Sequence, residues 1–494
     1  MQRRDISVGL LVAGAALVNQ RAEAQTCTAP CYTRTAAEIA AGVTPTNTAY
    51  TTVPYDVRRY GATGSGTTDD TVALSNALLV ASHEIHGACV FLPRGKYKIT
   101  SPLNVPNYVR LLGEGKLETT LLPVGAFNAC VQVIGASYAS WGVARAVEKI
   151  EIDGSGGFTG VGLWCQYLGL RCYFADLYIH NCSGKGVYIE GCFDHNYDRI
   201  ESRGNSSYGI HMYEKQTSPD GVYEELSKLV FYDCWAIENN DGGEQWRVDG
   251  GDTCSFLECK PSEGSIGLGF ERNCFGHRVS HLMYDQITSP GTGSAILTNA
   301  DWVQGLFIDG VETFQAQYAV LVNRGRNIHI EHVFQASGGA GVGVAATATG
   351  SVFLGEGISY ADARTAPQTY PRNYQGVWTP IFYGSGSTVG NGTLVANYLL
   401  DGNDFSFDLQ FTVGSSTIVG TGAGFSLPFS AVRLTALTSM GVQQSTSSHY
   451  TLNTFVPAGN IILVGTGTGY LSATSPFTWA AGDLLTISGA FRIA

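Results

Sequence analysis

One stretch near the N-terminus constrains the fold more than any other part of the chain. Residues 60–71 read YGATGSGTTDDT, a glycine-rich turn followed by two aspartates. A predicted strand, Asp56–Tyr60, leads into this turn. Either Asp69 or Asp70 can accept hydrogen bonds from the free N–H groups that open a helix. The pattern therefore predicts a strand, a tight turn and a helix that begins at the aspartate pair.

The residues after the aspartate pair predict a helix with one apolar stripe and then two strands. Apolar side chains recur at the spacing of one helical face, at Leu74, Leu78, Ala81 and Ile85. Strands are predicted at Cys89–Leu92 and Tyr97–Ile99, separated by Pro93 and Gly95. We expect the helix to cap the open end of a stack of strands.

These segments resemble the N-terminal signature of the pectate-lyase superfamily, in the branch with rhamnogalacturonase-like and epimerase-like members. The resemblance rests on YGATGSGTTDDT at 60–71 and VFLPRGKY at 90–97. It implies an all-β fold, a right-handed parallel β-helix with an N-terminal capping helix, and a role in handling polysaccharides. The sequence sets expected of a polygalacturonase (NTD, GHG and RIK) are absent, so a specific pectinase activity does not follow.

The first 24 residues read as an export signal. Arg3 and Arg4 precede the apolar run Val8–Val18, and Ala22-Glu23-Ala24 is a small-x-small cleavage site. The paired arginines resemble a twin-arginine signal, and an ordinary secretory signal is the alternative. The run is too short for a membrane span. We expect an exported bacterial protein, periplasmic or extracellular, in which residues 25–53 form an extended leader.

Charge and cysteine content narrow the partners and the chemistry. The formal net charge is −12, which argues against nucleic-acid and anionic-membrane binding. All twelve cysteines lie at or before Cys274. Export permits disulfides, but their pairing does not follow from the sequence. Many of these cysteines are expected to be small buried side chains inside the fold.

A short pattern recurs from about residue 148 to residue 360. Lys149–Gly154 matches Asp176–Asn181 and Arg199–Gly204, and Gly186–Glu190 matches Gly209–Tyr213. Repeats of roughly 22 to 28 residues correspond to one coil of a parallel β-helix. The sequence thus places this β-helix at residues 54–362. The segment 214–227 interrupts the pattern as an insertion between coils.

Composition changes after residue 362. Residues 363–375 contain two prolines and read as a linker. Residues 376–494 contain six charged residues and short alternating segments between Gly, Ser and Thr turns, which predicts an antiparallel β-sandwich or jelly roll. GVWTP at 376–380 and the terminal SGAFRI resemble C-terminal domains of phage tail spikes. That resemblance implies a target-binding or trimerising module, and hence a possible homotrimer.

Stacking the repeats by hand places candidate site residues on the outside of the coil. If Ile150, Leu177 and Ile200 point inward, the alternating residues point outward. One column then contains Glu151, Tyr178 and Glu201, and a second contains Asp153, His180 and Arg203. On another sheet, Tyr188 stacks over His211 and Glu190 over Tyr213. Carboxylates serve as acids and bases on sugars, an arginine neutralises charge, and aromatic rings offer stacking surfaces. An ordinary polar outer face is the alternative interpretation.

Two further clusters complete the candidates. Asp194, His195 and Asp198 lie in a predicted loop next to Arg199, with Glu214 on the next coil. Asp-His adjacency resembles the Asp-x-His site of mannuronan epimerases, although the intervening proline is missing. No cofactor is certain, but one acidic set could hold Ca²⁺: Asp233, Glu238, Asp241, Glu244 and Asp249.

The sequence therefore predicts an exported, polysaccharide-active β-helix protein. A lyase or a glycoside hydrolase is expected, with epimerisation also possible. The predicted catalytic residues are Asp153, His180, Asp194, His195, Asp198, Glu201 and Arg203. The predicted substrate-binding residues are Tyr178, Tyr188, His211, Tyr213 and Glu214. The alternatives are a non-catalytic glycan-binding adhesin or spike and a structural surface protein.

Overall fold

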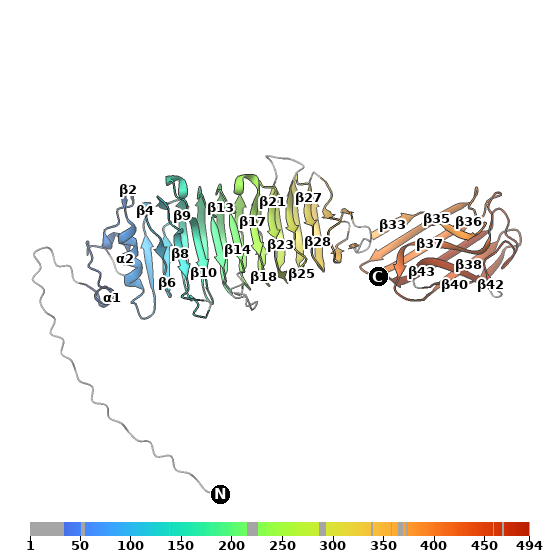
Figure 1. Ribbon diagram of the computed structural model, residues 1–494, viewed down its shortest axis with the longest axis horizontal. Coiled ribbons are helices and arrows are strands. Elements are labelled where there is room, and N and C mark those ends of the chain that lie inside the picture. Colours follow the sequence, from blue (N-terminus) through green and yellow to red (C-terminus); the bar gives the residue numbers. More distant parts are fainter. Residues whose placement is uncertain are drawn as a thin grey trace, which may run out of the picture.

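The computed structural model describes residues 34–50, 55–137, 139–214, 226–285, 293–336, 339–356, 358–363, 369–371, 374–457, 459–466 and 469–493. The predicted export signal, Cys27 and Cys31 lie outside these residues. The described chain forms a long coil of parallel strands followed by an antiparallel β-domain (Figure 1). This confirms the predicted all-β class and the parallel β-helix.

The coil is built from two long parallel sheets and a short one. The first sheet contains β1 (Tyr55–Asp56), β2 (Ser65–Asp69), β3 (Ala88–Leu92), β4 (Gly95–Ile99), β6 (Val109–Gly113), β7 (Thr119–Pro123), β9 (Ala146–Asp153), β11 (Tyr173–His180), β13 (Asn196–Arg203), β15 (Val230–Tyr232), β16 (Trp235–Ile237), β19 (Ser255–Leu257), β20 (Lys260–Ser262), β23 (Arg278–Asp285), β26 (Phe307–Phe314), β28 (Ile328–Gln335), β30 (Val352–Leu354) and β32 (Thr369–Pro371). The second contains β5 (Leu103–Asn104), β8 (Ala129–Ile134), β10 (Val161–Gln166), β12 (Val187–Glu190), β14 (Ile210–Tyr213), β17 (Glu244–Asp249), β21 (Ile266–Phe270), β24 (Ser294–Thr298), β27 (Tyr318–Val322), β29 (Val342–Val344) and β31 (Tyr360–Asp362). The short sheet contains β18 (Gly251–Asp252), β22 (Cys274–Phe275) and β25 (Val303–Gln304).

The corners of the coil are formed by residues with a positive φ, in the left-handed backbone conformation. The strands of the first sheet change direction in the middle of each coil, next to a residue with φ between 48° and 78°. These residues form one column: Lys149, Asp176, Arg199, Asp233, Glu258, His281, Gly310 and His332. Only glycine adopts this conformation without a steric penalty, and Asn, Asp and His are the commonest exceptions. The stacked hydrogen bonds of neighbouring coils therefore maintain a conformation that an isolated chain would avoid.

Apolar side chains fill the inside of the coil. Phe174, Tyr197, Phe231 and Phe256 lie on successive coils with ring centroids 4.8–5.4 Å apart. The ten described cysteines are free thiols, and all but Cys89 are buried. The expectation that many cysteines act as small buried side chains is thereby confirmed. The stacked interior fixes the register of the coils, and with it the positions of the outward-facing residues.

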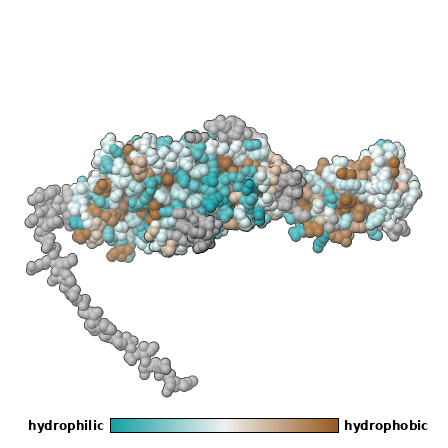
Figure 2. Space-filling model, viewed as in Figure 1, coloured by the Kyte–Doolittle hydropathy of each residue, from teal (hydrophilic) through white to brown (hydrophobic). Residues whose placement is uncertain are grey.

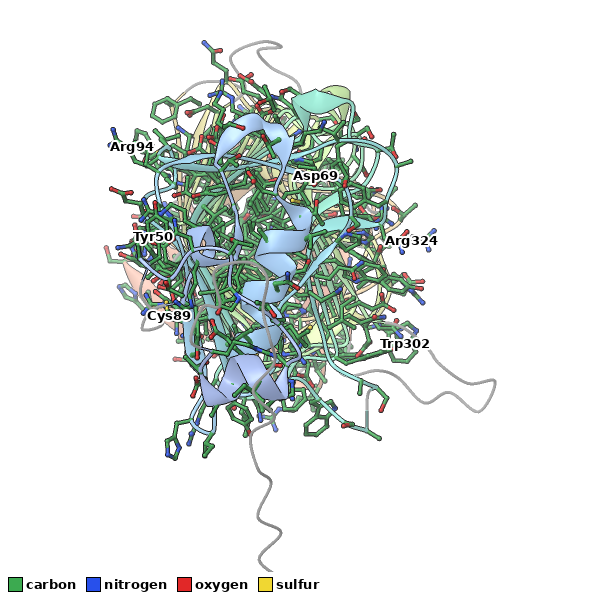
Figure 3. The ribbon with its side chains drawn as sticks, turned by 90° about the vertical axis from the view of Figure 1, so that its left-hand side faces the viewer. Tyr50, Asp69, Cys89, Arg94, Trp302 and Arg324 are labelled. Atoms are coloured by element: carbon green, nitrogen blue, oxygen red, sulfur yellow. The ribbon has the colours of Figure 1, made fainter. Side chains whose placement is uncertain are left out.

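The N-terminal end of the coil is covered by helices. Helix α2 (Thr71–Ala81) packs over the first strands, and Figure 3 shows it in front of the coil seen from that end. Asp69 caps it by accepting from the Thr71 N–H, whereas Asp70 turns back to accept from Thr63 and Gly64. The expected apolar stripe is wrong at Ile85, which lies beyond the end of the helix and is 92% exposed.

Two other N-terminal expectations need correction. Residues predicted as the strand Asp56–Tyr60 form a short strand and then the 3₁₀-helix η1 (Val57–Tyr60), because Asp56 accepts from the Arg58 N–H and caps it. Within the expected extended leader, helix α1 (Ala36–Ala40) docks on the coil. Its Glu38 side chain is fully buried and pairs with Arg59 at 2.6 Å. This buried ion pair attaches residues 34–50 to the cap.

The C-terminal part is an antiparallel sheet folded around its own core. Its strands are β33 (Tyr374–Trp378), β34 (Phe382–Ser385), β35 (Thr393–Asp401), β36 (Asp404–Thr412), β37 (Thr421–Ala431), β38 (Thr435–Gln443), β39 (Ser448–Thr451), β40 (Asn453–Val456), β41 (Gly459–Thr466), β42 (Gly469–Tyr470) and β43 (Leu484–Arg492). Its core is separate from that of the coil. Figure 2 shows brown, apolar patches on this part and teal, hydrophilic side chains over the middle coils. Across the described residues, no helix is long and apolar enough to cross a membrane.

Candidate functional site

The predicted columns on the first sheet are confirmed by the strand register. Tyr178 pairs with Glu151 on one side and Glu201 on the other. His180 pairs in the same way with Asp153 and Arg203. We call this outer face the striped wall. Its first column continues beyond Glu201, and its members are Glu151, Tyr178, Glu201, Trp235, Lys260, Met283, Glu312 and Phe334.

Most polar groups at the N-terminal end of the striped wall are paired with one another. The His180 Nε2 atom lies 2.9 Å from Glu151 Oε1 and its Nδ1 lies 2.7 Å from the Asn181 amide. The His180 ring stacks on Tyr178, with centroids 4.3 Å apart. Burial would raise the pKa of Asp153, but hydrogen bonds from Ser155 and Asn181 outweigh it and lower that pKa. These contacts describe a satisfied polar surface.

Two cation–carboxylate pairs cross the middle coils of the same face. Arg203 binds Glu238 through two hydrogen bonds of 2.8 and 2.9 Å, and the bond from Arg203 lowers the pKa of Glu238. The Lys116 Nζ atom lies 3.5 Å from Glu201 Oε2. Arg203 is therefore already committed to a carboxylate. A catalytic role for Asp153, His180, Glu201 and Arg203 stays a prediction.

The structure corrects the second predicted cluster. The segment expected to be a loop enters strand β13 at Asn196, and the His195 side chain points into the coil. Its ring is 3% exposed and hydrogen-bonds to Phe193 O and Tyr197 Oη. Burial lowers the pKa of His195 to about 4. Because its ring lies inside the coil, bonded to Tyr197, His195 cannot touch a polysaccharide.

The rest of that cluster lies outside the coil. Asp194 is exposed at a left-handed corner, with φ of 56°. Asp198 accepts from Tyr173 Oη at 2.7 Å and lies 3.1 Å from Arg199. Arg199 also pairs with Asp176 at 2.7 Å. Asp194 and Asp198 therefore remain accessible, but they do not assemble around His195.

A second outer face, formed by β10, β12, β14 and β17, gathers the predicted binding residues with others. Tyr188 pairs with His211 and Glu190 with Tyr213, as the sequence predicted. The next coil continues these columns, because His211 pairs with Arg247 and Tyr213 with Asp249. We call this face the buried-charge wall. Its members are Trp164, Tyr188, Glu190, His211, Tyr213, Glu244, Arg247 and Asp249.

An ionic cluster occupies the centre of the buried-charge wall. Asp249 Oδ2 accepts from His211 Nε2 at 2.9 Å and from Arg247 Nε at 2.8 Å. Arg247 Nη1 reaches Glu244 Oε2 at 3.2 Å. Glu244, His211 and Asp249 are only 7%, 8% and 6% exposed. Their interactions therefore take place in a largely desolvated environment, where electrostatic effects are stronger than in water.

The pKa values of the two carboxyl groups in this cluster are shifted in opposite directions. Burial, with repulsion from Glu271, raises the pKa of Glu244 to about 8 despite Arg247. Burial also opposes ionisation of Asp249, but hydrogen bonds from His211 and Arg247 prevail and lower its pKa. Burial lowers the pKa of His211. At neutral pH Glu244 is thus protonated, Asp249 ionised and His211 neutral.

Several polar atoms of this wall have no hydrogen-bond partner. Within the described residues, these atoms are buried and unpaired: Glu244 Oε1, Asp249 Oδ1, His211 Nδ1 and Trp164 Nε1. Buried polar atoms are nearly always paired, so each exception needs an explanation. Because His211 Nε2 faces the Asp249 carboxylate, the neutral ring carries its proton there and leaves Nδ1 as a free base. The cluster therefore holds an unpaired acid and unpaired bases side by side.

Aromatic rings surround the ionic cluster. His211 lies 5.3 Å from the Tyr188 ring and 5.0 Å from the Tyr208 ring. The Lys185 ammonium lies 3.6 Å above the Tyr188 ring, and its charge is partly desolvated. Flat aromatic faces with cations beside them provide surfaces for stacking and charge contacts.

A glycine makes room for the protonated carboxyl. Gly269 is the partner of Arg247 on the next coil, and Glu244 lies across it. A Cβ atom at Gly269 would lie 1.8 Å from Glu244 Oε1. Any side chain at this position would therefore displace Glu244.

The predicted calcium-binding set does not assemble. Among the described residues, no group of three or more His, Cys, Asp or Glu side chains is placed to hold a metal ion. Glu238 pairs with Arg203, and Glu244 and Asp249 share Arg247. Asp233 accepts from Trp235 Nε1. The Asp241 side chain lies outside the described part.

The sequence signal for this centre is weak. The sequence places Glu244 and Asp249 only among possible cation ligands, and no motif marks Arg247. The segment between β14 and β17 lengthens this coil, so the repeat that would align Arg247 with His211 is hard to see. The alternation of Trp246, Arg247, Val248 and Asp249 was the available signal.

Comparison with known proteins agrees with this architecture. The family described as "Rhamnogalacturonase A/epimerase, pectate lyase-like" matches residues 55–197. The match confirms the resemblance carried by residues 60–71 and 90–97.

Individual relatives cover smaller parts or are more distant. Mannuronan C5-epimerase AlgE1 of Azotobacter vinelandii is 28% identical over 109 residues, 20% of this chain and 8% of the epimerase. The non-secreted LysM effector LysM19 of Penicillium expansum is 44% identical over 206 residues, 36% of this chain and 16% of that protein. The Dettilon tailspike protein has a TM-score of 0.45 at 10% identity, covering 89% of this chain and 94% of that one. The chain spans at most 16% of the length of these curated relatives.

Proposed function

We propose that the protein is a glycan-cleaving enzyme that works by acid–base chemistry at the buried-charge wall. The pectate lyase-like match and the similarity to a mannuronan epimerase support a glycan as the substrate. The observation that carries the proposal is that Glu244 and Asp249 are both buried against Arg247, in surroundings that shift their pKa values in opposite directions. Carboxyl groups whose environments separate their pKa values are the usual acid and base of glycoside hydrolysis.

The proposed reaction is hydrolysis of a glycosidic bond. Glu244 donates its proton to the glycosidic oxygen as the bond from that oxygen to the anomeric carbon breaks. Water adds to the anomeric carbon and gives its proton to Asp249 Oδ1, the buried oxygen that accepts no hydrogen bond. This step requires the surrounding aromatic side chains to move and admit the sugar. Arg247 and His211 hold the other oxygen of Asp249 in place. Tyr188 and Tyr213 supply flat faces for neighbouring sugars.

One observation favours a second reaction, β-elimination or epimerisation of a uronate. His211 Nδ1 is a free base next to Arg247, and this pairing suits removal of a proton beside a carboxylate whose charge the arginine balances. In epimerisation Glu244 delivers a proton to the opposite face of the carbon that lost one. In β-elimination it protonates the departing glycosidic oxygen as the bond from that oxygen to the neighbouring carbon breaks. The two reactions leave different products.

The remaining expectations from the sequence complete the proposal. We place the protein outside the bacterial cytoplasm after removal of residues 1–24. Its polysaccharide contacts include Tyr178, Tyr188, His211, Tyr213 and Glu214, and its C-terminal β-domain binds the target or holds a homotrimer together. Few carboxylates in residues 376–494 leave that domain poorly equipped for acid–base chemistry.

The test is turnover of a panel of acidic and neutral polysaccharides by the full chain and by Glu244→Gln. We expect Glu244→Gln to lower turnover by about 10²- to 10⁴-fold, as for loss of a general acid. Glu118→Gln is the matched control, because Glu118 is an exposed carboxylate at the N-terminal end of the coil. New reducing ends without new ultraviolet absorbance indicate hydrolysis, and absorbance from a conjugated uronate indicates elimination.

The outcomes separate the proposal from its rivals. Turnover that survives Glu244→Gln contradicts the assignment of the acid. No turnover of any glycan by the folded wild type, with glycan binding retained, favours an adhesin. Stable oligomers without turnover or binding favour a structural surface protein.

A further inference from the structure

The striped wall carries an alternation that runs from β9 to β28. Its first column reads Glu151, Tyr178, Glu201, Trp235, Lys260, Met283, Glu312 and Phe334, one residue per coil. The register of the paired strands joins most of these neighbours. Lys260 and Met283 are adjacent because the Met283 N–H donates to Cys259 O at 3.0 Å. From each coil to the next, the column thus alternates between a charged side chain and a flat or apolar one.

Three of the four flat or apolar members of this column are exposed to solvent, and Tyr178 is half-buried against His180. Trp235 is 38%, Met283 38% and Phe334 59% exposed. Neighbouring coils are about 4.8 Å apart, so an apolar surface recurs roughly every 9.6 Å along the axis. Exposed apolar side chains that gather on one face mark a recognition surface, whereas scattered single ones are ordinary.

Two hollows lie on the same column. A small one of about 100 Å³ is lined by Lys116, Arg199, Glu201 and Trp235 among others. A larger one of about 520 Å³ is lined by Met283, Glu312 and Phe334 together with His281 and His332. Gly310 opens the larger hollow, because it occupies the corner position between His281 and His332 without a side chain.

Charge on the column excludes one class of ligand. The larger hollow is lined by the carboxylates of Glu258, Glu312 and Glu356, and its described lining contains no lysine or arginine. Elsewhere on the wall, Lys260 pairs with Asp285 at 3.0 Å and Arg203 with Glu238. A chain of uronates would be repelled by these carboxylates, because few free cations offset them. An uncharged or amino-bearing sugar would not be repelled.

We propose that the striped wall is a binding track for an extended glycan chain without carboxylates, lying along the coil axis. In an extended β-1,4-linked chain successive sugars are flipped, so the same ring face recurs at every second sugar. The apolar side chains at every second coil match that repeat, and the charged side chains between them meet hydroxyl groups. The inference rests on a glycan as the ligand, as in the proposed function, but it concerns a different face and needs no chemistry there.

The experiment measures equilibrium binding of β-1,4-linked glucose oligomers of two to eight units by calorimetry. The protein carries Glu244→Gln, so that turnover does not alter the ligand. We expect affinity to rise stepwise with each added disaccharide. Trp235→Ala and Phe334→Ala should each weaken binding of the longest oligomer by roughly ten-fold. Trp235→Tyr should restore most of the loss, because it keeps a flat ring.

Matched controls come from aromatic residues that are equally exposed elsewhere. Trp302 is 52% and Phe307 51% exposed, and neither lies in the column. Trp302→Ala and Phe307→Ala should leave binding unchanged. The track is contradicted if the controls weaken binding as much as Trp235→Ala does, if a uronate oligomer binds more tightly, or if affinity does not depend on length.

The design keeps this inference separable from the proposed function. Binding that depends on Trp235 with no turnover by the wild type supports the track and contradicts the enzyme. Turnover that depends on Glu244 with no effect of Trp235 or Phe334 on binding supports the enzyme and contradicts the track.

Discussion

Two outer faces of the same coil differ in how far their charged side chains are exposed to solvent and paired. On the buried-charge wall, Glu244, His211 and Asp249 are less than a tenth exposed and each has one atom without a partner. On the striped wall, Arg203 and Glu238 have side chains that are 45% and 47% exposed and bind each other fully. Both faces follow the same alternation of inward and outward residues. The comparison shows that burial, rather than residue type, separates a reactive cluster from a satisfied surface.

Packing against the neighbouring coil is one reason why the charged groups are more buried on the buried-charge wall than on the striped wall. Glu244 lies over Gly269, close enough that a Cβ atom would collide with it. Tyr188, Tyr208 and Tyr213 screen His211. On the striped wall Arg203 and Glu238 are about half exposed, and water can solvate both of them. Exposed ion pairs contribute little to stability, whereas one charge left alone in a buried cluster is costly.

The largest expected contrast comes from the same substitution on the two walls. Asp249→Asn should lower the free energy of unfolding by about 3–5 kcal/mol, because Arg247 and His211 lose a buried charged partner. It should also lower turnover by about 10²-fold or more. Asp285→Asn, which breaks a pair with Lys260 on the striped wall, should cost within about 1 kcal/mol. Urea unfolding of the wild type, Asp249→Asn and Asp285→Asn measures these free energies. Equal losses in the two variants would contradict the distinction between the walls.

The pH dependence of stability should differ between the wild type and Glu244→Gln. The pKa of Glu244 is about 8 in the folded protein against a usual value of 4.5. The folded state holds a proton that the unfolded state releases, so this contribution to stability is complete below pH 4.5 and is lost as pH rises to 8. The loss is on the order of several kcal/mol. Urea unfolding of the wild type and of Glu244→Gln, measured across this pH range, isolates the loss due to Glu244 from the opposite effect of His211. Parallel curves of unfolding free energy against pH for the two proteins would contradict the raised pKa of Glu244.

A smaller effect is expected from filling the space beside the acid. Gly269→Ala should push the Glu244 side chain toward solvent and cost about 1–3 kcal/mol. It should also bring the pKa of Glu244 down toward its usual value, which moves the alkaline limb of the pH–rate profile to lower pH. Gly469→Ala is the control, because a Cβ atom there meets no atom within 4 Å. An unchanged profile for Gly269→Ala would show that packing does not set this pKa.

The smallest effect is expected from a pair on the striped wall. Arg203→Ala should change the free energy of unfolding by less than about 1 kcal/mol, because both partners remain solvated. Thermal unfolding against the wild type measures it. A cost as large as that of Asp249→Asn would mean that the striped wall is as tightly coupled as the buried-charge wall.

The sequence predicted the register of the coil well, and the reason is physical. The inward positions of Ile150, Leu177 and Ile200 repeat with little interruption, so the outward columns follow from the two-residue period of a strand. His195 was misassigned because its polar type outweighed its place in the chain. It shares the inward parity of Tyr197, and burial makes it a core residue.

The ionic cluster was harder to predict. Its members come from β14 and β17, which are separated in sequence by an insertion that hides their alignment. The raised pKa of Glu244 depends on desolvation by side chains from other coils, and no local pattern reports that. The end of helix α2 was missed for a similar reason. Ile85 fits the apolar spacing, but the helix ends at Ala81 and leaves Ile85 exposed, which the spacing alone does not reveal.

The most direct test of the account is the protonation state of Glu244 at neutral pH. Difference infrared spectroscopy of the wild type against Glu244→Gln reports the carbonyl band of a protonated carboxyl group. The account predicts such a band at pH 7 in the wild type, absent from the variant and lost with a midpoint near pH 8. No band at pH 7, or a midpoint near the usual 4.5, would contradict the account, because Glu244 would then be an ordinary carboxylate.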